Sequence, residues 1–301
     1  MIFKNFLSIK KNKIIKKDLL NLLKKQPKLF ETLKPNYQYS YSKKIISKYQ
    51  KFDNIRVIGM GGSVLGTEAI YNFLKKKIKK KFTFVNNLNS NADYFKDKNI
   101  NLNLIISKSG NTLETIANAN TLIKSKDSNI VITENKNSYL TDLAKKLKAE
   151  IFEHKNYVGG RYSVLSEVGM LPAELMNLNE NKFKQFNNLI KNKNFINNLV
   201  NNVAATLNLI KGGKNTSVIL NYDEKSENLF KWYQQLIAES LGKKSKGILP
   251  IISSMPKDNH SLMQLYLDGP KKNFYTFFNV LDNRMIELNN SSIISSHKYL
   301  K

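Results

Sequence analysis

The sequence contains no cysteine and very little histidine or arginine, and these shortages exclude several kinds of site. Without cysteine there is no disulfide framework, thiol nucleophile or thiolate metal ligand. The three histidines are His154, His260 and His297, so a zinc site built from histidine would need nearly all of them. We therefore expect neither a dedicated metal site nor a bound cofactor.

Long hydrophobic runs are also missing. No apolar stretch approaches the roughly 20 residues that cross a membrane. The N-terminal residues place a lysine every few positions among their apolar pairs, so they lack the continuous core of a secretory signal. We interpret them as an amphipathic surface helix, and we expect a cytoplasmic protein without membrane contact.

The charge is strongly one-sided, at +26 from 49 basic and 23 acidic residues, which raises the question of nucleic-acid binding. Nearly all the basic residues are lysines, and arginine occurs only at Arg56, Arg161 and Arg284. Base readout relies heavily on arginine, and no RNA-recognition, zinc-finger or Arg-Gly-Gly pattern is present. We expect no nucleic-acid partner, and we expect the positive field to attract a phosphorylated substrate.

Short apolar segments alternate with helical patterns in the first half of the chain. Strands are predicted at residues 55–59, 82–85, 102–107, 130–133 and 150–152, and helices at 64–74, 112–124 and 138–147. Buried strands that alternate with helices predict an α/β fold, with a parallel sheet between two layers of helices.

The rest of the chain predicts a connector and a second α/β unit. A long polar helical stretch at about 181–210 precedes strands at 217–220, 248–252 and 274–280 and a helix at 227–241. Before the first unit the chain looks helical and peripheral, with Pro27 and Pro35 interrupting the pattern. We divide the chain into an N-terminal helical segment (1–50), a first subdomain (51–175), a helical connector (176–212) and a second subdomain (213–301).

Two loops that each follow a strand predict a phosphate-binding site. Gly61, Gly62 and Ser63 open a helix, where free backbone N–H groups and the positive helix end suit an anion. A turn of this composition is also common as a plain tight turn.

The loop at residues 107–112 is more specific. Three hydroxyl groups and one ammonium group gather at one helix start, on Ser107, Lys108, Ser109 and Thr112. This set suits the several oxygens and the charge of a phosphate monoester. The alternative is a capped helix with a capping-box pair of Asn111 and Glu114, but capping needs only one such residue.

The pattern Ser-x-Ser-Gly-Asn-Thr-x-Glu-Thr at residues 107–115 resembles the sugar isomerase (SIS) domain, which binds phosphosugars. The Gly-Gly-Ser turn one βαβ unit earlier fits the same domain, so this resemblance covers residues 50–153. It implies a sugar phosphate ligand but no particular reaction, because SIS domains also serve in sensors and transferases.

Three further segments resemble the glucose-6-phosphate isomerase family, in that family's order. They read GGRYSVLSEVGMLPAEL at 159–175, QLIAESLGKKSKGILP at 235–250 and NHSLMQLYLDGP at 259–270. The resemblance implies two SIS-type subdomains with three-layer αβα packing and a homodimer whose active site a neighbouring subunit's histidine completes. It also implies that Glu239 is the base, that His260 assists ring opening and that Arg161 stabilises the intermediate.

The chemistry of such a reaction fits the residues around Glu239. Aldose–ketose isomerisation moves a proton between C1 and C2 through an enediolate, and one carboxylate can abstract and return it. Glu239 lies four residues after Gln235, so both share a helix face. We expect Trp232, on nearly that face, to desolvate the carboxylate and raise its pKa. The alternative is an ordinary solvated surface carboxylate.

Arg161 follows Gly159 and Gly160, whose missing side chains leave room for a ligand. Its fixed charge and planar donors suit a developing enediolate oxygen. The alternative is a structural ion pair with Glu153 or Glu167. Since lysine serves as the surface cation elsewhere in this chain, an arginine at this position is informative.

His260 precedes a helix and can shuttle a proton near neutral pH, although the sequence around it also resembles a capping turn. His154 and His297 have no such context, and we interpret them as surface residues.

The chain departs from the family near its C-terminus. The family continues with a segment whose lysine helps open the sugar ring, and no such motif follows His260 before Lys301. Either the chain is a fragment, or a shortened form uses another lysine, for which Lys298 and Lys301 are candidates by position only. Three other functions compete: a bifunctional phosphoglucose/phosphomannose isomerase, a non-catalytic phosphosugar-binding SIS protein and a basic nucleic-acid binder.

Overall fold

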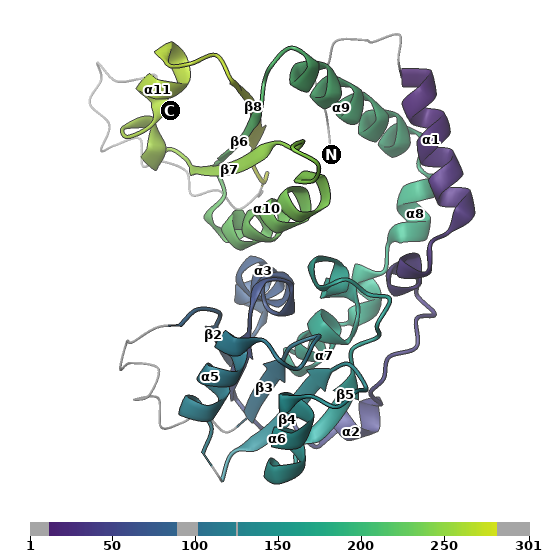
Figure 1. The fold of residues 1–301 in the computed structure, drawn as a ribbon, viewed down its shortest axis with the longest axis vertical. Coiled ribbons are helices and arrows are strands. Elements are labelled where there is room, and N and C mark those ends of the chain that lie inside the picture. Colours follow the sequence, from purple (N-terminus) through teal and green to yellow (C-terminus); the bar gives the residue numbers. More distant parts are fainter. Residues whose placement is uncertain (1–11, 89–101, 125, 282–301) are drawn as a thin grey trace, which may run out of the picture.

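The computed structural model describes residues 12–88, 102–124 and 126–281. Its lower half in Figure 1 is built on a five-stranded sheet with strand order β2-β1-β3-β4-β5. The strands are β1 (Asn54–Gly59), β2 (Lys81–Val85), β3 (Leu102–Ile106), β4 (Ser128–Thr133) and β5 (Glu150–Glu153), and all pairs are parallel. The strand order reverses between β1 and β3, and ligands of open parallel sheets bind at such a reversal.

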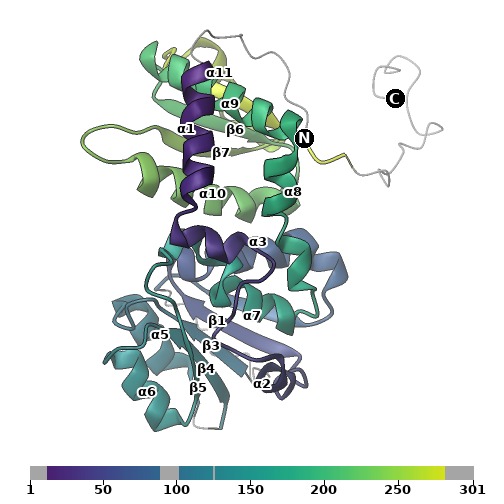
Figure 2. The same cartoon turned by 90° about the vertical axis from the view of Figure 1, so that its right-hand side faces the viewer.

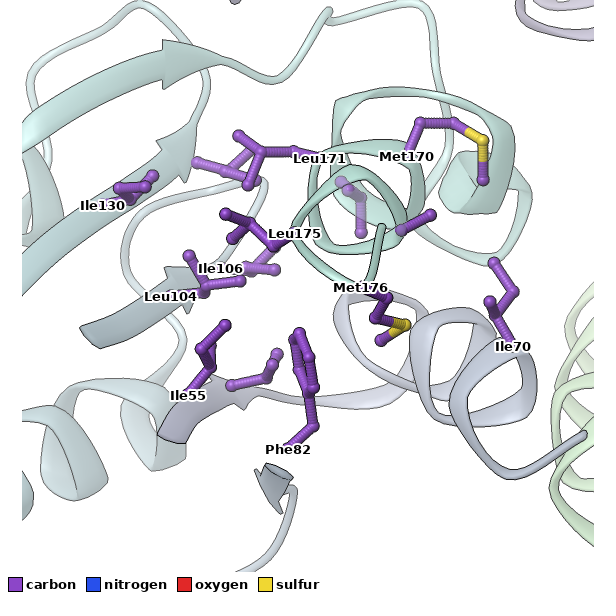
Figure 3. Packing of buried hydrophobic residues seen from close by; sticks show 14 of the residues in the cluster. Ile55, Ile70, Phe82, Leu104, Ile106, Ile130, Met170, Leu171, Leu175 and Met176 are labelled. Carbon is purple, nitrogen blue, oxygen red and sulfur yellow. The ribbon is translucent and has the colours of Figure 1, made fainter. Parts of the chain in front are cut away.

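Helices cover both faces of this sheet. They are α3 (Leu65–Leu74), α5 (Leu113–Leu122), α6 (Tyr139–Leu147) and α7 (Glu167–Leu175). In β3, Leu104 and Ile106 face Leu171 and Leu175 of α7 (Figure 3), whereas Ile105 packs on the opposite face with α5 and α6. Because both faces are buried, the strands read as continuous apolar runs, and each buried aliphatic side chain contributes roughly 1.5–3 kcal/mol.

A second parallel sheet forms the upper half, with strand order β7-β6-β8. Its elements are β6 (Thr216–Asn221), α10 (Glu227–Leu241), β7 (Leu249–Ser254), α11 (Met263–Asp268) and β8 (Asn273–Phe278). Phe230 of α10 packs edge-on against Phe278, with ring centroids 4.8 Å apart. On the other face, Met263 and Tyr266 of α11 pack near Val218. The predicted fold class, α/β with parallel sheets flanked by helices, is confirmed.

The connector between the sheets is helical over most of residues 181–210, as predicted, but it is divided into three separate helical segments. It consists of η5 (Glu180–Phe183), α8 (Phe186–Lys191) and α9 (Lys193–Lys211). Helical structure breaks at Lys184, whose buried ammonium group donates to the carbonyl oxygens of Thr32 and Leu165. Burial lowers the pKa of Lys184 to about 8. Asn192 then starts α9 by accepting a hydrogen bond from the Phe195 amide.

The N-terminal part of the chain is only partly peripheral. Helix α1 (Asn12–Lys25) has no buried residue and lies beside α9 (Figure 2), where Asn12 donates to Asn201 at 2.7 Å. It is followed by η1 (Lys28–Leu33) and α2 (Lys43–Ser47). Between these two, Tyr37 and Tyr41 are buried, and the hydroxyl of Tyr37 donates to the Glu167 carboxylate, both oxygens lying at 3.1 Å. The expectation of a peripheral helical segment is therefore wrong here, because a buried carboxylate requires hydrogen-bond donors.

Three further short 3₁₀ turns are η3 (Lys75–Lys77), η6 (Glu224–Ser226) and η7 (Lys257–Asn259). No helix within the described ranges is both long enough and apolar enough to span a membrane.

Two turns of the first half meet α10, which lies between the two sheets (Figure 1). They are η2 (Gly61–Ser63), after β1, and η4 (Gly160–Leu165), after β5. The two turns touch through their backbones: a Cβ on Gly62 would lie 2.2 Å from the carbonyl carbon and oxygen of Gly160. The Ser163 hydroxyl donates to the carbonyl oxygens of Gly62 at 3.1 Å and Gly160 at 2.7 Å. Only glycine fits at Gly62.

This contact predicts a difference between two neighbouring glycines. Gly62→Ala should lower the free energy of unfolding by about 1–3 kcal/mol, since the added methyl group forces the two turns apart. Gly160→Ala is the matched control: its Cβ would have no atom within 4 Å, so the change should stay within about 0.5 kcal/mol. Urea unfolding measures both, and equal effects would contradict the close packing of η2 on η4.

Candidate active site

The two loops predicted to bind phosphate lie at the carboxyl ends of neighbouring strands. Strands β1 and β3 pair in parallel up to Gly59 and Ile106, so η2 and the loop at 107–112 emerge side by side at the carboxyl ends of these strands. The strand order reverses between β1 and β3, and ligands of open parallel sheets usually bind beyond the strand ends at such a reversal.

The loop at 107–112 is shaped by hydrogen bonds other than helix capping. The Ser107 and Thr112 hydroxyls lie 2.8 Å apart. Thr112 occupies the N-cap position of α5, but its side chain makes no capping bond. The capping-box pair does not form, since the Asn111 side chain accepts from the Tyr139 amide at 2.9 Å and Ser109 Oγ accepts from the Asn111 amide at 3.2 Å. The first turn of α5 thus keeps its N–H groups available to an anion.

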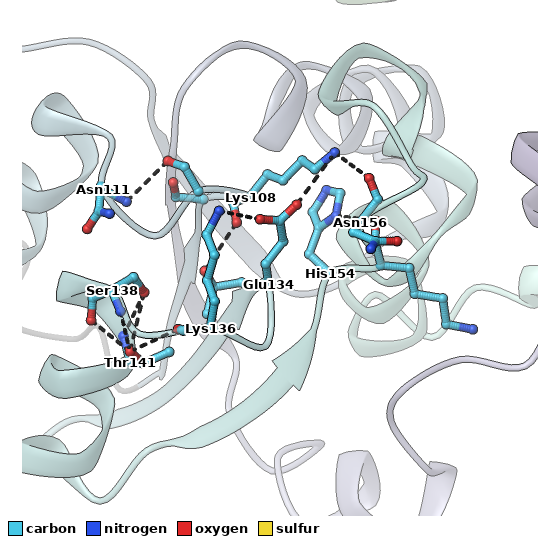
Figure 4. Close-up of polar contacts among 12 residues, drawn as sticks. Lys108, Asn111, Glu134, Lys136, Ser138, Thr141, His154 and Asn156 are labelled. Carbon is cyan, nitrogen blue, oxygen red and sulfur yellow. Dashed lines mark hydrogen bonds and ion pairs between the residues drawn. The ribbon is translucent and has the colours of Figure 1, made fainter.

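Lys108 points away from the Ser107–Thr112 pair. Its ammonium group donates to the carbonyl oxygen of Asn156 at 2.7 Å and lies 3.7 Å from the Glu134 carboxylate (Figure 4). The hydrogen bond from Lys136 lowers the pKa of Glu134, so this carboxylate is a stable anionic partner. The Lys108 side chain therefore connects the loop to Asn156 and Glu134 instead of facing the proposed phosphate position. The proposed phosphate donors are the hydroxyl groups of Ser107, Ser109 and Thr112.

His154 is buried beside this cluster, at 1% exposure, so its prediction as a surface residue is wrong. It follows the last residue of β5, and its Nδ1 lies 3.3 Å from the carbonyl oxygen of Lys155. Burial lowers its pKa, which favours the neutral ring.

Arg161 reaches across from η4 to α10. Its Nη1 donates to Glu239 Oε2 at 3.1 Å, and its Nε donates to Ser240 Oγ at 3.0 Å. The alternative partner Glu167 is occupied by Tyr37 and the Ser40 amide. The structure thus joins two of the predicted catalytic residues, one from each sheet's unit.

The other described arginine has a different environment. Arg56 is buried in β1, where its Nη1 donates to the carbonyl oxygen of Leu122 at 2.9 Å. Arg284, like His297, Lys298 and Lys301, lies outside the described residues.

Gln235 and Glu239 share a face of α10, as their spacing predicts: Gln235 Nε2 donates to Glu239 Oε1 at 2.7 Å. Gln235 also lies over Gly61, where an added Cβ would approach its Nε2 to 2.9 Å. The expected desolvation by Trp232 is not observed, because the Glu239 side chain is 49% exposed. The indole instead donates to the carbonyl oxygen of Arg161 at 2.9 Å, which fixes the backbone of η4 against α10.

The sequence analysis did not predict that Tyr162 and Ser240 belong to the site. Tyr162 stacks its ring against the Arg161 guanidinium, 4.6 Å from Cζ to the ring centroid, and its hydroxyl lies 2.9 Å from Ser240 Oγ. Both residues stand directly beside a predicted catalytic residue in the quoted motifs, but periodicity alone does not show that they meet.

His260 does not join this group. It is exposed and follows η7, beyond the carboxyl end of β7, whereas Glu239 lies near the C-terminus of α10. Helix α10 runs back from the carboxyl end of β6 to the amino end of β7. Glu239 therefore lies near the amino ends of the strands of the second sheet, and His260 lies beyond their carboxyl ends. A six-residue strand spans about 20 Å, which separates them beyond direct contact within one chain.

Among the described residues, no group of three or more histidine, aspartate or glutamate side chains is arranged to hold a metal ion. The site thus offers a half-exposed carboxylate, a guanidinium and an amide next to η2, and the loop before α5 emerges from the neighbouring strand. This set can bind an anionic substrate and move a proton next to a stabilised oxyanion.

The sequence of the chain is similar to one protein family over most of its length. The phosphoglucose isomerase family model matches residues 9–253. Glucose-6-phosphate isomerase of Methanocaldococcus jannaschii is 37% identical over 251 residues, which cover 77% of this chain and 62% of that relative. The chain thus spans less than two thirds of that relative's length.

Solved structures share the fold. A hypothetical protein from Thermus thermophilus superposes with a TM-score of 0.72 at 23% identity, over 88% of this chain and 69% of its own. Glucose-6-phosphate isomerase from Chlamydia trachomatis superposes with a TM-score of 0.59 at 22% identity, over 78% of this chain and 51% of its own. These structures show the shared fold, and the matched sequence shows that the chain belongs to the phosphoglucose isomerase family.

Proposed function

We propose that this protein interconverts D-glucose 6-phosphate and D-fructose 6-phosphate through an enediolate, without a metal or cofactor. The contact between Arg161 and Glu239, 3.1 Å across the two units, carries this proposal. It supports the proposal because Glu239, the proposed base, and Arg161, the proposed oxyanion-stabilising cation, lie together beside η2, which contacts α10 and emerges next to the loop at 107–112.

The substrate phosphate would bind at the start of α5. Ser107, Ser109 and Thr112 offer hydroxyl donors there, and the first-turn N–H groups and the helix dipole favour the anion. Ser63 and the η2 backbone follow the neighbouring strand, next to this loop. The net charge of +26 would raise the local concentration of a sugar phosphate.

The proton transfer would use Glu239 and Arg161 in turn. Glu239 takes the proton from C2 of the open-chain aldose, so the C–H electron pair forms the enediolate double bond and the charge moves to oxygen. Arg161 stabilises that oxygen. The hydroxyl proton on O2 passes to O1, and the same carboxylate returns the carbon-bound proton to C1 as C2 becomes the carbonyl carbon. Gln235 donates to Glu239 Oε1 at 2.7 Å and lies over Gly61, so it would hold the proposed base next to η2.

Ring opening would need a further acid–base group, and the family resemblance gives this role to His260. Because His260 and Glu239 lie at opposite ends of the strands of the second sheet, His260 would have to come from a neighbouring subunit. We therefore propose a homodimer with a shared active site. The proposal includes a cytoplasmic location, which we expect from the N-terminal sequence pattern, and a role in glycolysis and gluconeogenesis, which the resemblance implies.

A first test replaces the base. If the protein turns over substrate, Glu239→Gln should reduce turnover at least ~10²-fold with sugar phosphate still bound, since the amide keeps size but cannot accept the proton. Glu227→Gln is the matched control, because Glu227 lies at the other end of the same helix and pairs with Lys231 at 3.1 Å. A coupled assay of fructose 6-phosphate conversion measures both, and near-normal turnover of Glu239→Gln would exclude it as the base.

A second test addresses the proposed phosphate-binding loop. Thr112→Val and Ser109→Ala should weaken binding of fructose 6-phosphate far more than binding of fructose, with roughly 1.5–3 kcal/mol lost per charge-assisted hydrogen bond. Thr121→Val is the control within α5, since its hydroxyl bonds only the local Ala117 carbonyl. Calorimetric titration with both sugars would show equal losses if the loop were merely structural.

A third test mixes two inactive variants. Glu239→Gln and His260→Ala should each be nearly inactive alone. After dissociation and re-association, about a quarter of the wild-type activity should return, since half of the dimers are mixed and each holds one intact site. Sedimentation first establishes the oligomeric state. An active, monodisperse monomer would rule out the shared site.

A further inference from the structure

Two hydroxyl-bearing side chains contact the Arg161 guanidinium independently of Glu239. Arg161 Nε donates to Ser240 Oγ at 3.0 Å, while Nη1 donates to Glu239 at 3.1 Å. Ser240 Oγ also lies 2.9 Å from the Tyr162 hydroxyl, and the Tyr162 ring covers the guanidinium at 4.6 Å. The arginine is thus held at its Nε edge and on one face.

These contacts determine where the terminal nitrogens point. A guanidinium is planar and rigid, so a bond at Nε together with a ring on one face fixes the directions of Nη1 and Nη2. Neither contact requires the Glu239 carboxylate. The backbone of Arg161 is fixed as well, by the hydrogen bond from the Trp232 indole.

The two hydroxyls and the guanidinium form one polarised network. The hydrogen bond with Ser240, and after it the neighbouring Arg161, lower the pKa of the Tyr162 hydroxyl. Since Ser240 directly follows Glu239 in α10, the helix that supplies the carboxylate also supplies the anchor of its partner. Both groups therefore move together if α10 shifts relative to η4.

We propose that Ser240 and Tyr162 are positioning residues that keep Arg161 aimed at the reacting oxygens when Glu239 releases it to act on the substrate. The inference rests on the proposed isomerase reaction. Without the anchor, a long arginine side chain would follow the carboxylate or turn to solvent, and the developing negative charge would lose its fixed donor.

Kinetics of three variants test the proposal. Ser240→Ala and Tyr162→Phe should each lower kcat about 10- to 100-fold while KM for fructose 6-phosphate changes less than about threefold, since alignment matters most in the transition state. Their double variant should be no more than about threefold slower than the slower single variant, because both act through one network. Ser240→Thr keeps the hydroxyl and should recover kcat to within about threefold of wild type.

Binding gives a second readout that needs no turnover. The 5-phosphate of arabinonic acid carries a carboxylate where the enediolate would have its oxygens. In calorimetric titrations Ser240→Ala should weaken this compound about tenfold, but fructose 6-phosphate less than about threefold. Tyr222→Phe is the control, since Tyr222 is 41% exposed in the second unit, and it should change neither affinity.

The outcomes separate the two proposals. If the wild type binds both compounds without turnover, the isomerase reaction is refuted. The positioning role is then tested by the affinity for arabinonic acid 5-phosphate relative to that for fructose 6-phosphate, compared between Ser240→Ala and the wild type. An unchanged ratio together with unchanged kcat overturns that role, as does a kcat that Ser240→Thr does not recover. A wild type that binds neither compound overturns both proposals.

Discussion

The backbone contact between Gly62 and Gly160 is the constraint on which the candidate site depends. It seats η4 directly on the turn that follows β1, and Arg161 is the next residue of η4. Any side chain at Gly62 would separate the two turns and move the guanidinium from α10. The buried ammonium group of Lys184 holds η4 from the opposite end, through the Leu165 carbonyl. The position of one arginine thus follows from tight packing rather than from its own side-chain preferences.

The ion pair between Arg161 and Glu239 contributes little to the stability of the fold and can be replaced by a contact with a substrate. The Arg161 side chain is 21% exposed and that of Glu239 is 49% exposed, and ion pairs between exposed groups contribute about 0–1 kcal/mol. A substrate oxygen could therefore replace the carboxylate at Nη1 at small cost. In contrast, the buried carboxylate of Glu167 is held by Tyr37 and the Ser40 amide, and its burial raises its pKa. These two glutamates have the same chemistry but differ in what surrounds them.

The alternation of apolar strands and helices in the sequence is enough to predict an α/β fold, since it leaves few arrangements other than a parallel sheet between helices. The sequence also located the strands within a residue or two, and it predicted that Gln235 and Glu239 share a helix face, because that depends only on helical periodicity. Local patterns failed where distant segments decide the structure. The break at Lys184 and the burial of His154 come from contacts with residues far along the chain.

The contacts that surround Arg161 depend on packing between distant segments of the chain. That Trp232 bonds the Arg161 backbone instead of covering Glu239, and that Ser240 and Tyr162 hold the guanidinium, depends on how α10 lies against η4. Residues 161 and 240 are separated by a whole connector and a strand, so no local rule relates their positions. Periodicity fixes which face of a helix a side chain occupies, whereas the partner on that face is set by packing between units.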